Sequence, residues 1–175
     1  MAVGMWSADC FTRKGYATEQ GKRLMLNGVL KPIEVLLIED NAGDVRLTRE
    51  ALRDGKLAVN LTIAMDGIEA TDILHHRNGH ANASRPDLIL LDLNLPKKDG
   101  RQLLLEIKQD AELMCIPVVV LTTSNADSDI QATYGAHANC YITKPIDPES
   151  YVDMVNLLEE FWFTVVKLPV HDVEL

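Results

Sequence analysis

Short apolar runs that alternate with helical stretches constrain the fold of this chain more than any other feature of its sequence. Five runs are predicted strands, at residues 33–38, 59–64, 88–92, 117–122 and 140–143. Five stretches with apolar residues at spacings of three and four are predicted helices, at 43–54, 67–78, 99–109, 127–134 and 148–166. Continuous apolar strands that alternate with helices are typical of a parallel sheet covered on both faces. We therefore expect an α/β fold, a doubly wound five-stranded parallel sheet with helices on both faces.

The chain divides by pattern into three parts. Residues 1–31 are polar and aperiodic, so we expect a disordered or weakly ordered N-terminal extension. All five strand–helix units lie within residues 32–168, which form the predicted domain. The last residues, 169–175, are expected to be a C-terminal tail.

Composition excludes several classes of function. The chain has 26 Asp and Glu against 17 Lys and Arg, for a net charge of −9, which counts against a nucleic-acid surface. No apolar run approaches the length of a membrane span, so no membrane contact is expected. The three cysteines, Cys10, Cys115 and Cys140, follow no ligand spacing. Such cysteine usage is typical of a reduced compartment, and we expect a cytoplasmic protein.

Residues 87–100 read DLILLDLNLPKKDG, and they place a carboxylate, Asp92, directly after an apolar run. A buried, unpaired charge is so costly that the group would instead protonate. Asp92 therefore needs a cation, a cluster of hydrogen bonds or a chemical role.

Polar side chains also follow three of the other predicted strands. In an open α/β sheet the functional site lies off the carboxyl ends of the strands. We therefore expect carboxylates, hydroxyl groups and one lysine to gather at that edge. The residues concerned are Glu39, Asp40, Asn41, Asp92, Asn94, Thr122, Thr123, Ser124, Thr143 and Lys144.

Three close carboxylates, Glu39, Asp40 and Asp92, cannot all stay ionised without a cation. A set of oxygen ligands without His or Cys suits Mg²⁺ or Mn²⁺. Lys144 and Thr122 would supply a positive charge and a hydroxyl group to a phosphoryl group. Asp92 then has two possible roles, as a metal ligand and as a nucleophile that forms an aspartyl phosphate.

Together these residues resemble the receiver domain of two-component response regulators over about residues 33–166. The motifs that carry the resemblance are LLIEDN, LLDLNLPKKDG, VVVLTTS and CYITKP. The spacing is similar too, since Thr122 lies 30 residues and Lys144 52 residues after Asp92. The wording DLNLPKKDG and NCYITKP is most similar to the small response regulators of cyanobacterial phytochromes, the Rcp type.

The resemblance implies a CheY-like, flavodoxin-like fold with strand order 2-1-3-4-5, and it implies a role for each site residue. Asp92 would be the phosphoacceptor, and Thr122 with Tyr141 would form the switch. Thr123 departs from the small residue common in the family, which puts access to the phosphoryl group in doubt. The implied metal ligands are Glu39, Asp40, Asp92 and the backbone carbonyl of Asn94, and the implied phosphoryl-binding residues are Thr122 and Lys144.

The implied partner is a sensor histidine kinase, which for the Rcp type would be a phytochrome. Such a receiver is not an enzyme in the usual sense, because it catalyses only its own phosphorylation and dephosphorylation. Only nine residues follow residue 166, so we expect output through protein contact with an unknown downstream partner or through onward phosphotransfer.

Three alternatives compete with this interpretation. A flavodoxin-like electron carrier would need a phosphate loop rich in Ser, Thr or Gly after the first strand, where EDNAGD stands. A haloacid-type phosphatase would have a second acid two residues after its nucleophile, where this chain has Asn94. A degenerate receiver, acting unphosphorylated, would lack some of the five key positions, which are all intact here. His75, His76 and His80 are interpreted as surface residues and not as a metal site.

The last predicted helix is apolar on more than one side. Between residues 151 and 168, 12 of 18 residues are apolar or aromatic. A helix that is apolar all round is buried all round, and a single domain covers only one side. We therefore expect a homodimer through this helix, with Phe161, Trp162 and Phe163 at the interface.

Overall fold

The computed structural model describes residues 25–26, 29–55 and 57–169. The chain divides into two units, Met1–Lys31 and Pro32–Leu175. In the first unit, β1 (Met25–Leu26) pairs antiparallel with β2 (Val29–Leu30). Residues 1–24 and 27–28 of the predicted extension, and residues 170–175 of the predicted tail, lie outside the described residues, so the predicted domain boundaries stay predictions.

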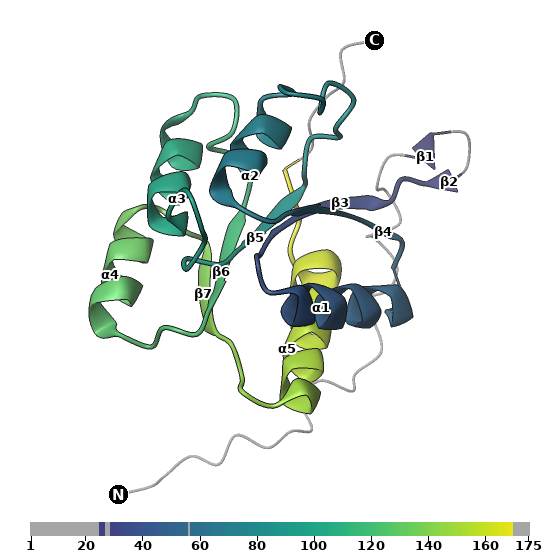
Figure 1. Cartoon of the computed structure of the whole chain (residues 1–175). Helices are drawn as coiled ribbons and strands as arrows, with labels where there is room; N and C mark the ends of the chain where they lie inside the picture. Colours follow the sequence, from purple (N-terminus) through teal and green to yellow (C-terminus); the bar gives the residue numbers. More distant parts are fainter. Residues whose placement is uncertain (1–24, 27–28, 56, 170–175) are drawn as a thin grey trace, which may run out of the picture. The chain divides into compact units, whose positions relative to one another are not determined.

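The second unit is built on a five-stranded sheet in which every pairing is parallel (Figure 1). The strands are β3 (Ile33–Ile38), β4 (Val59–Ala64), β5 (Leu88–Leu91), β6 (Val118–Thr122) and β7 (Cys140–Thr143). Their order across the sheet is β4-β3-β5-β6-β7. Counted along this sheet alone, that is the order 2-1-3-4-5, so the predicted fold class is confirmed.

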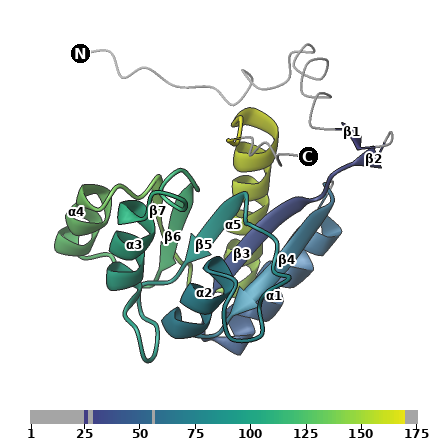
Figure 2. The same ribbon diagram turned by 90° about the horizontal axis from the view of Figure 1, so that it is seen from above.

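Helices cover both faces of the sheet (Figures 1 and 2). One face packs against α2 (Gly67–Leu74) and α3 (Gly100–Gln109), with Ala136 after α4 (Asp127–Gly135) in the same core. The other face packs against α1 (Ala42–Asp54), α5 (Pro148–Glu160) and the π-helical segment η3 (Phe161–Val165). Alternate strand residues point to opposite faces of the sheet, so Leu36 lies in one core and Leu37 in the other. Because both faces are covered, the strand sequences are apolar throughout.

Among the described residues, four of the five α-helices begin at an Asn or Asp whose side chain accepts backbone N–H groups of the first turn. The caps are Asn41, Asp66, Asp99 and Asp147. Each cap pairs N–H groups that the first turn of a helix would otherwise leave without a partner. Helix α4 differs, because Ala126 offers no side-chain cap.

Two helices end at other residues, or with another geometry, than the periodicity of the sequence predicted. Helix α2 ends at Leu74 and not at residue 78, because His76 and Asn78 adopt left-handed φ values of 56° and 50°. The predicted helix 148–166 changes from α to π geometry at Phe161, and the Val166 N–H donates to the Phe161 carbonyl at 3.0 Å. Within the described residues, no helix combines the length and the apolar character needed to cross a membrane.

Candidate functional site

The carboxyl edge of the sheet gathers polar side chains from four strands. Glu39 follows β3, Asp92 follows β5, Thr122 ends β6 and Lys144 follows β7. All four residues are buried, although each carries a charged or hydroxyl group. The strand order therefore brings together these four of the residues that the sequence indicated for one site.

Lys144 lies at the centre of this cluster. Its Nζ donates to Asp92 Oδ2 at 2.6 Å, to Asp44 Oδ2 at 3.0 Å and to Glu39 Oε2. An ammonium group has three N–H donors, and here each one meets a carboxylate. Asp44, in the first turn of α1, was not among the predicted site residues. This network answers the question raised by Asp92, since its carboxylate has a cation within hydrogen-bond distance.

Burial and charge pairing set the protonation of this cluster. Burial raises the pKa of Glu39 from 4.5 to about 7, although the hydrogen bond from Lys144 opposes that rise. Burial alone would lower the pKa of Lys144, but its hydrogen bonds with Asp92 and Glu39 outweigh this effect and hold that pKa above its usual value. Lys144 therefore remains protonated near neutral pH and supplies a permanent positive charge to the site.

The loop after β5 orients the carboxylate of Asp92 through a backbone hydrogen bond. The Asn94 N–H donates to Asp92 Oδ1 at 3.0 Å, so the two carboxylate oxygens have different partners. The Gly100 N–H donates to the Leu93 carbonyl at 3.0 Å and folds the start of α3 against this loop. A Cβ at Gly100 would lie 2.2 Å from the Asp92 carbonyl oxygen, so a side chain does not fit there.

One group of acidic residues in the described part of the chain is arranged to hold a metal ion. Carboxylate oxygens of Glu39, Asp40 and Asp92 lie within 4.8 Å of one another. Asp40 is exposed, whereas the other two are buried, so the cluster opens to solvent on one side. A donor set made only of oxygen fits a hard divalent cation such as Mg²⁺ or Mn²⁺.

Thr122 and Tyr141 are linked through the β6–α4 loop. Thr122 Oγ1 accepts hydrogen bonds from Asn94 Nδ2 at 3.2 Å and from the Ser124 N–H at 3.4 Å. The Tyr141 hydroxyl donates to the Ser124 carbonyl at 2.9 Å. A displacement of Thr122 would therefore reach Tyr141 through one residue, Ser124.

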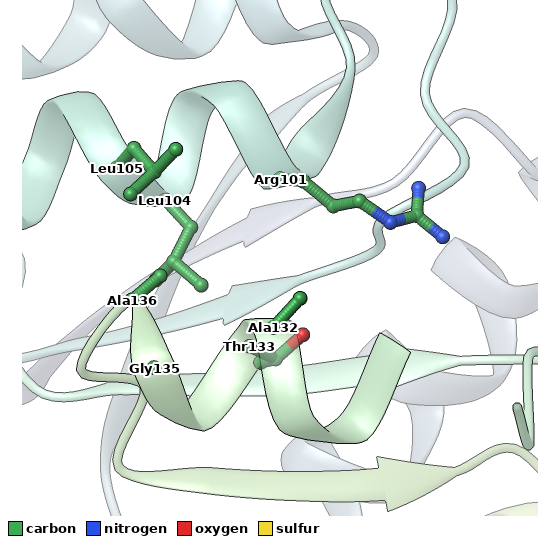
Figure 3. Close-up of a pocket in the computed structure, with 7 residues that line it drawn as sticks. All are labelled: Arg101, Leu104, Leu105, Ala132, Thr133, Gly135 and Ala136. Carbon is green, nitrogen blue, oxygen red and sulfur yellow. The ribbon is translucent and has the colours of Figure 1, made fainter. Parts of the chain in front are cut away.

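The same loop connects to a groove between α3 and α4 (Figure 3). Ser124 Oγ donates to Asp129 Oδ2 at 2.5 Å, and Arg101 binds both oxygens of Asp129 at 3.0 and 2.7 Å. The groove measures about 160 Å³, and Figure 3 shows Leu104 pointing across it from α3 toward α4. Thr133 on α4 is buried, and its hydroxyl has no partner within the described residues. The ion pair between Arg101 and Asp129 therefore ties α4 to α3.

The end of the last helix bears on the predicted dimer. Trp162 is only 7% exposed and packs into the chain's own core, so it contributes less free surface than the sequence suggested. Phe163 is also partly covered by that core, whereas Phe161 is 51% exposed. A groove of about 310 Å³ lies beside Phe161, and its lining residues are Cys140, Ile142, Met154, Leu157, Leu158, Phe161 and Trp162.

Comparison with known proteins identifies one family whose model matches most of the chain. The model of the response regulator receiver domain family matches residues 35–156. Response regulator Rcp1 of Synechocystis sp. is 47% identical over 138 residues, which cover 79% of this chain and 94% of Rcp1.

Two solved structures are similar along most of the chain. The crystal structure of the Mn²⁺-bound form of Rcp1 has a TM-score of 0.77 at 47% identity, and the match covers 79% of this chain and 100% of that one. The crystal structure of the phosphorylated cyanobacterial phytochrome response regulator RcpA has a TM-score of 0.78 at 48% identity, with 80% and 100% covered.

Proposed function

The chain belongs to the response regulator receiver family, and from this premise we propose that Asp92 accepts a phosphoryl group from the phosphohistidine of a sensor histidine kinase. The observation that carries the proposal is a buried carboxylate at a strand end, paired with Lys144 at 2.6 Å and next to two further acids. A phosphoryl acceptor needs a nucleophile, acidic residues that can hold a divalent cation, and donors for the phosphoryl oxygens in one place. The nucleophile would be Asp92, the acidic cluster would hold the cation, and Lys144 with Thr122 would be the donors.

The transfer is a displacement at phosphorus. A carboxylate oxygen of Asp92 forms the new O–P bond while the P–N bond of the phosphohistidine breaks, and the imidazole nitrogen leaves with the electron pair. Lys144 and the hydroxyl of Thr122 bind the transferred phosphoryl oxygens. Because both groups are buried, they stabilise the developing charge more strongly than they would in water.

Glu39, Asp40 and Asp92, with the backbone carbonyl of Asn94, would hold Mg²⁺ or Mn²⁺. We expect Asp40 to bind the ion directly, because it is the exposed member of the acidic cluster. The support is the all-oxygen donor set, together with the Mn²⁺-bound form of the similar protein Rcp1. A bound divalent cation neutralises the acidic residues and lets a negatively charged phosphodonor approach.

Signalling would follow from a change of surface near Thr122 and Tyr141. When Thr122 turns toward a phosphoryl group, its hydrogen bond with the Ser124 N–H is lost, and the loop that holds the Tyr141 hydroxyl is released. The output is then contact with a downstream protein. The similarity to RcpA, a phytochrome response regulator, supports a phytochrome as the kinase partner.

The phosphoacceptor proposal is tested by intact mass measurement after incubation with Mg²⁺ and acetyl phosphate. We expect one added phosphoryl group per chain, and none after chelation of the metal. Asp92→Asn should remain unlabelled. Asp99→Asn, which changes the N-cap of α3 after the same strand β5, should still be labelled. Equal, metal-dependent labelling of Asp92→Asn would refute the assignment.

We further propose that the chain forms a homodimer through α5 and the adjacent edge of the sheet. Leu157, Phe161 and Val165 are exposed there, and exposed aromatic anchors often dominate the energy of an interface. A two-fold axis would bring the same groove of each chain into the interface. Analytical ultracentrifugation should show a dimer at micromolar concentration that Phe161→Asp weakens.

A matched control for the dimer is Leu105→Asp, because Leu105 on α3 is 45% exposed and lies on a different helix. This control should leave the dimer intact. A monomeric wild type, in both phosphorylated and unphosphorylated forms, would contradict the dimer.

Residues 32–168 are proposed to form the complete receiver domain, with 1–31 as an extension and 169–175 as a tail. A chain that begins at Met25 should therefore melt at the same temperature as the full chain and accept a phosphoryl group normally. A clear loss of stability on truncation would contradict this division.

A further inference from the structure

Asp44 differs from the other two carboxylates that bind Lys144. Glu39 and Asp92 both belong to the cluster arranged for a cation, whereas Asp44 does not. Its Oδ2 lies 3.0 Å from Lys144 Nζ, and its side chain is 23% exposed. Lys144 thus has two partners that a divalent cation would compete for and one partner that it would not.

Packing between α1 and α5 fixes Asp44 in this position. Asp44 and Thr48 are one helical turn apart, so they lie on the same face of α1. Thr48 is fully buried, and its hydroxyl forms a 3.1 Å hydrogen bond with the hydroxyl of Tyr151 on α5. Asn41, which caps α1, also accepts the Asp44 N–H at 3.3 Å. The carboxylate therefore projects from an anchored turn, and its approach to Lys144 does not depend on a loop.

We propose that Asp44 is a positioning residue for phosphoryl transfer. It holds the Lys144 ammonium at the site when the cation and the phosphoryl group draw the charge of Glu39 and Asp92 away from it. This inference rests on the proposed function of the site. It adds a residue that neither attacks phosphorus nor binds the metal but acts through Lys144.

The structure gives the reason why such a residue is needed. The Lys144 side chain is 2% exposed, so it has almost no water to replace a lost carboxylate partner. A buried ammonium left without partners carries a large desolvation cost. Without Asp44, Lys144 would compete more strongly with the cation for Glu39 and Asp92, so the cation would bind less tightly.

The test is Mn²⁺ binding to the unphosphorylated protein, followed by electron paramagnetic resonance of free Mn²⁺. Loss of an outer partner that orients a metal site weakens binding by about tenfold or more, so Asp44→Asn should raise the Mn²⁺ dissociation constant by about tenfold. Asp54→Asn removes the same charge from the exposed end of α1 and should change it less than about twofold. Thermal melting of both variants checks that they fold.

A double-mutant cycle with Lys144→Gln separates action through Lys144 from the direct attraction between Asp44 and the cation. If Asp44 acts through Lys144, most of the tenfold loss should disappear in the Lys144→Gln background. An equal loss in both backgrounds would overturn the inference, and so would wild-type affinity in Asp44→Asn. An equal loss in Asp54→Asn would also overturn it, since the effect would then be one of net charge.

Phosphorylation by acetyl phosphate, measured at saturating Mn²⁺, gives the second readout. Asp44→Asn should be labelled about tenfold more slowly than wild type, because Lys144 no longer meets the phosphoryl oxygens in a fixed position. Absence of labelling in the wild type would overturn the proposed function, while the Mn²⁺ cycle would still decide on Asp44. If the wild type is labelled normally but Asp44→Asn weakens Mn²⁺ binding equally with and without Lys144→Gln, only the inference about Asp44 is overturned.

Discussion

Substitution of Gly100 by alanine should damage both stability and phosphorylation, because this glycine packs against the backbone of Asp92, the proposed phosphoacceptor. A Cβ at Gly100 would lie 2.2 Å from the Asp92 carbonyl oxygen and 2.7 Å from Leu93 Cα. Both neighbours are backbone atoms, so no side-chain rotation relieves the overlap. The loop that carries Asp92, or the first turn of α3, must move instead.

The magnitude follows from two opposing contributions. Overpacking of this kind costs about 1–3 kcal/mol, and contacts this short, with backbone on both sides, favour the upper end. The lower backbone entropy of alanine in the unfolded chain returns about 0.4–1 kcal/mol. We therefore expect Gly100→Ala to lower the free energy of unfolding by about 2 kcal/mol. For a chain of this length, the melting temperature should fall by about 4–8 °C.

Urea unfolding followed by circular dichroism measures this loss, and Gly135→Ala provides the matched control. Gly135 ends α4, and a Cβ there would meet nothing within 4 Å, so alanine should stabilise the fold by about 0.5 kcal/mol. Gly100→Ala should also accept a phosphoryl group more slowly than Gly135→Ala. Wild-type stability in Gly100→Ala, with an unchanged denaturant slope, would refute the reasoning.

Three further predictions concern interactions around the site. Thr48→Val should lower the free energy of unfolding by about 1–2 kcal/mol in a urea titration, because it leaves the buried Tyr151 hydroxyl without its partner. Arg101→Met should lower it slightly through loss of the two-point contact with Asp129, and added salt should narrow the difference from wild type. The pKa of Glu39 is raised from 4.5 to about 7 in the folded state, so its stabilising effect is complete below pH 4.5 and is lost as the pH rises through 7. Metal-free protein should therefore lose up to about 3 kcal/mol between pH 5 and 8 in chelator, and a flat profile would contradict the raised pKa.

The fold could be predicted from the sequence because its determinants are local and repeated. A run such as Leu88–Leu91 is too short for a helix and too apolar for an exposed strand, which leaves a strand buried on both faces. The strand ends then predicted which polar residues would meet, since parallel strands share one carboxyl edge. Glu39, Asp92, Thr122 and Lys144 are buried together for that reason.

Sequence analysis did not predict Asp44 as a site residue, because its place in the first turn of a helix is enough to explain an acidic residue there. An acidic residue in the first turn of a helix is favoured by the helix dipole whatever else it contacts. Its partner, Lys144, is 100 residues away in sequence. Lys144 follows β7, and only the packing of α1 on the sheet brings Asp44 to that strand end. The periodicity of a single helix does not specify this arrangement.

The helix ends show a similar limit. Periodicity extended the second predicted helix to residue 78. In the structure α2 ends at Leu74, because the backbone at His76 is left-handed. Trp162 lies four residues after Leu158 and shares its core, whereas Phe161 is exposed. The predicted interface nevertheless included both aromatic residues, because a helix that is apolar on several sides does not show by its pattern which side another chain would cover.

The central claim is that Asp92 carries the phosphoryl group, and the most direct test is to locate that group in the wild-type chain. After transfer from an autophosphorylated sensor histidine kinase, the chain is digested and its peptides are analysed by mass spectrometry. The account predicts phosphorylation on the peptide that contains Asp92 alone, with a matching loss of phosphohistidine from the kinase. Phosphorylation at any other residue, with Asp92 unmodified, would contradict the account.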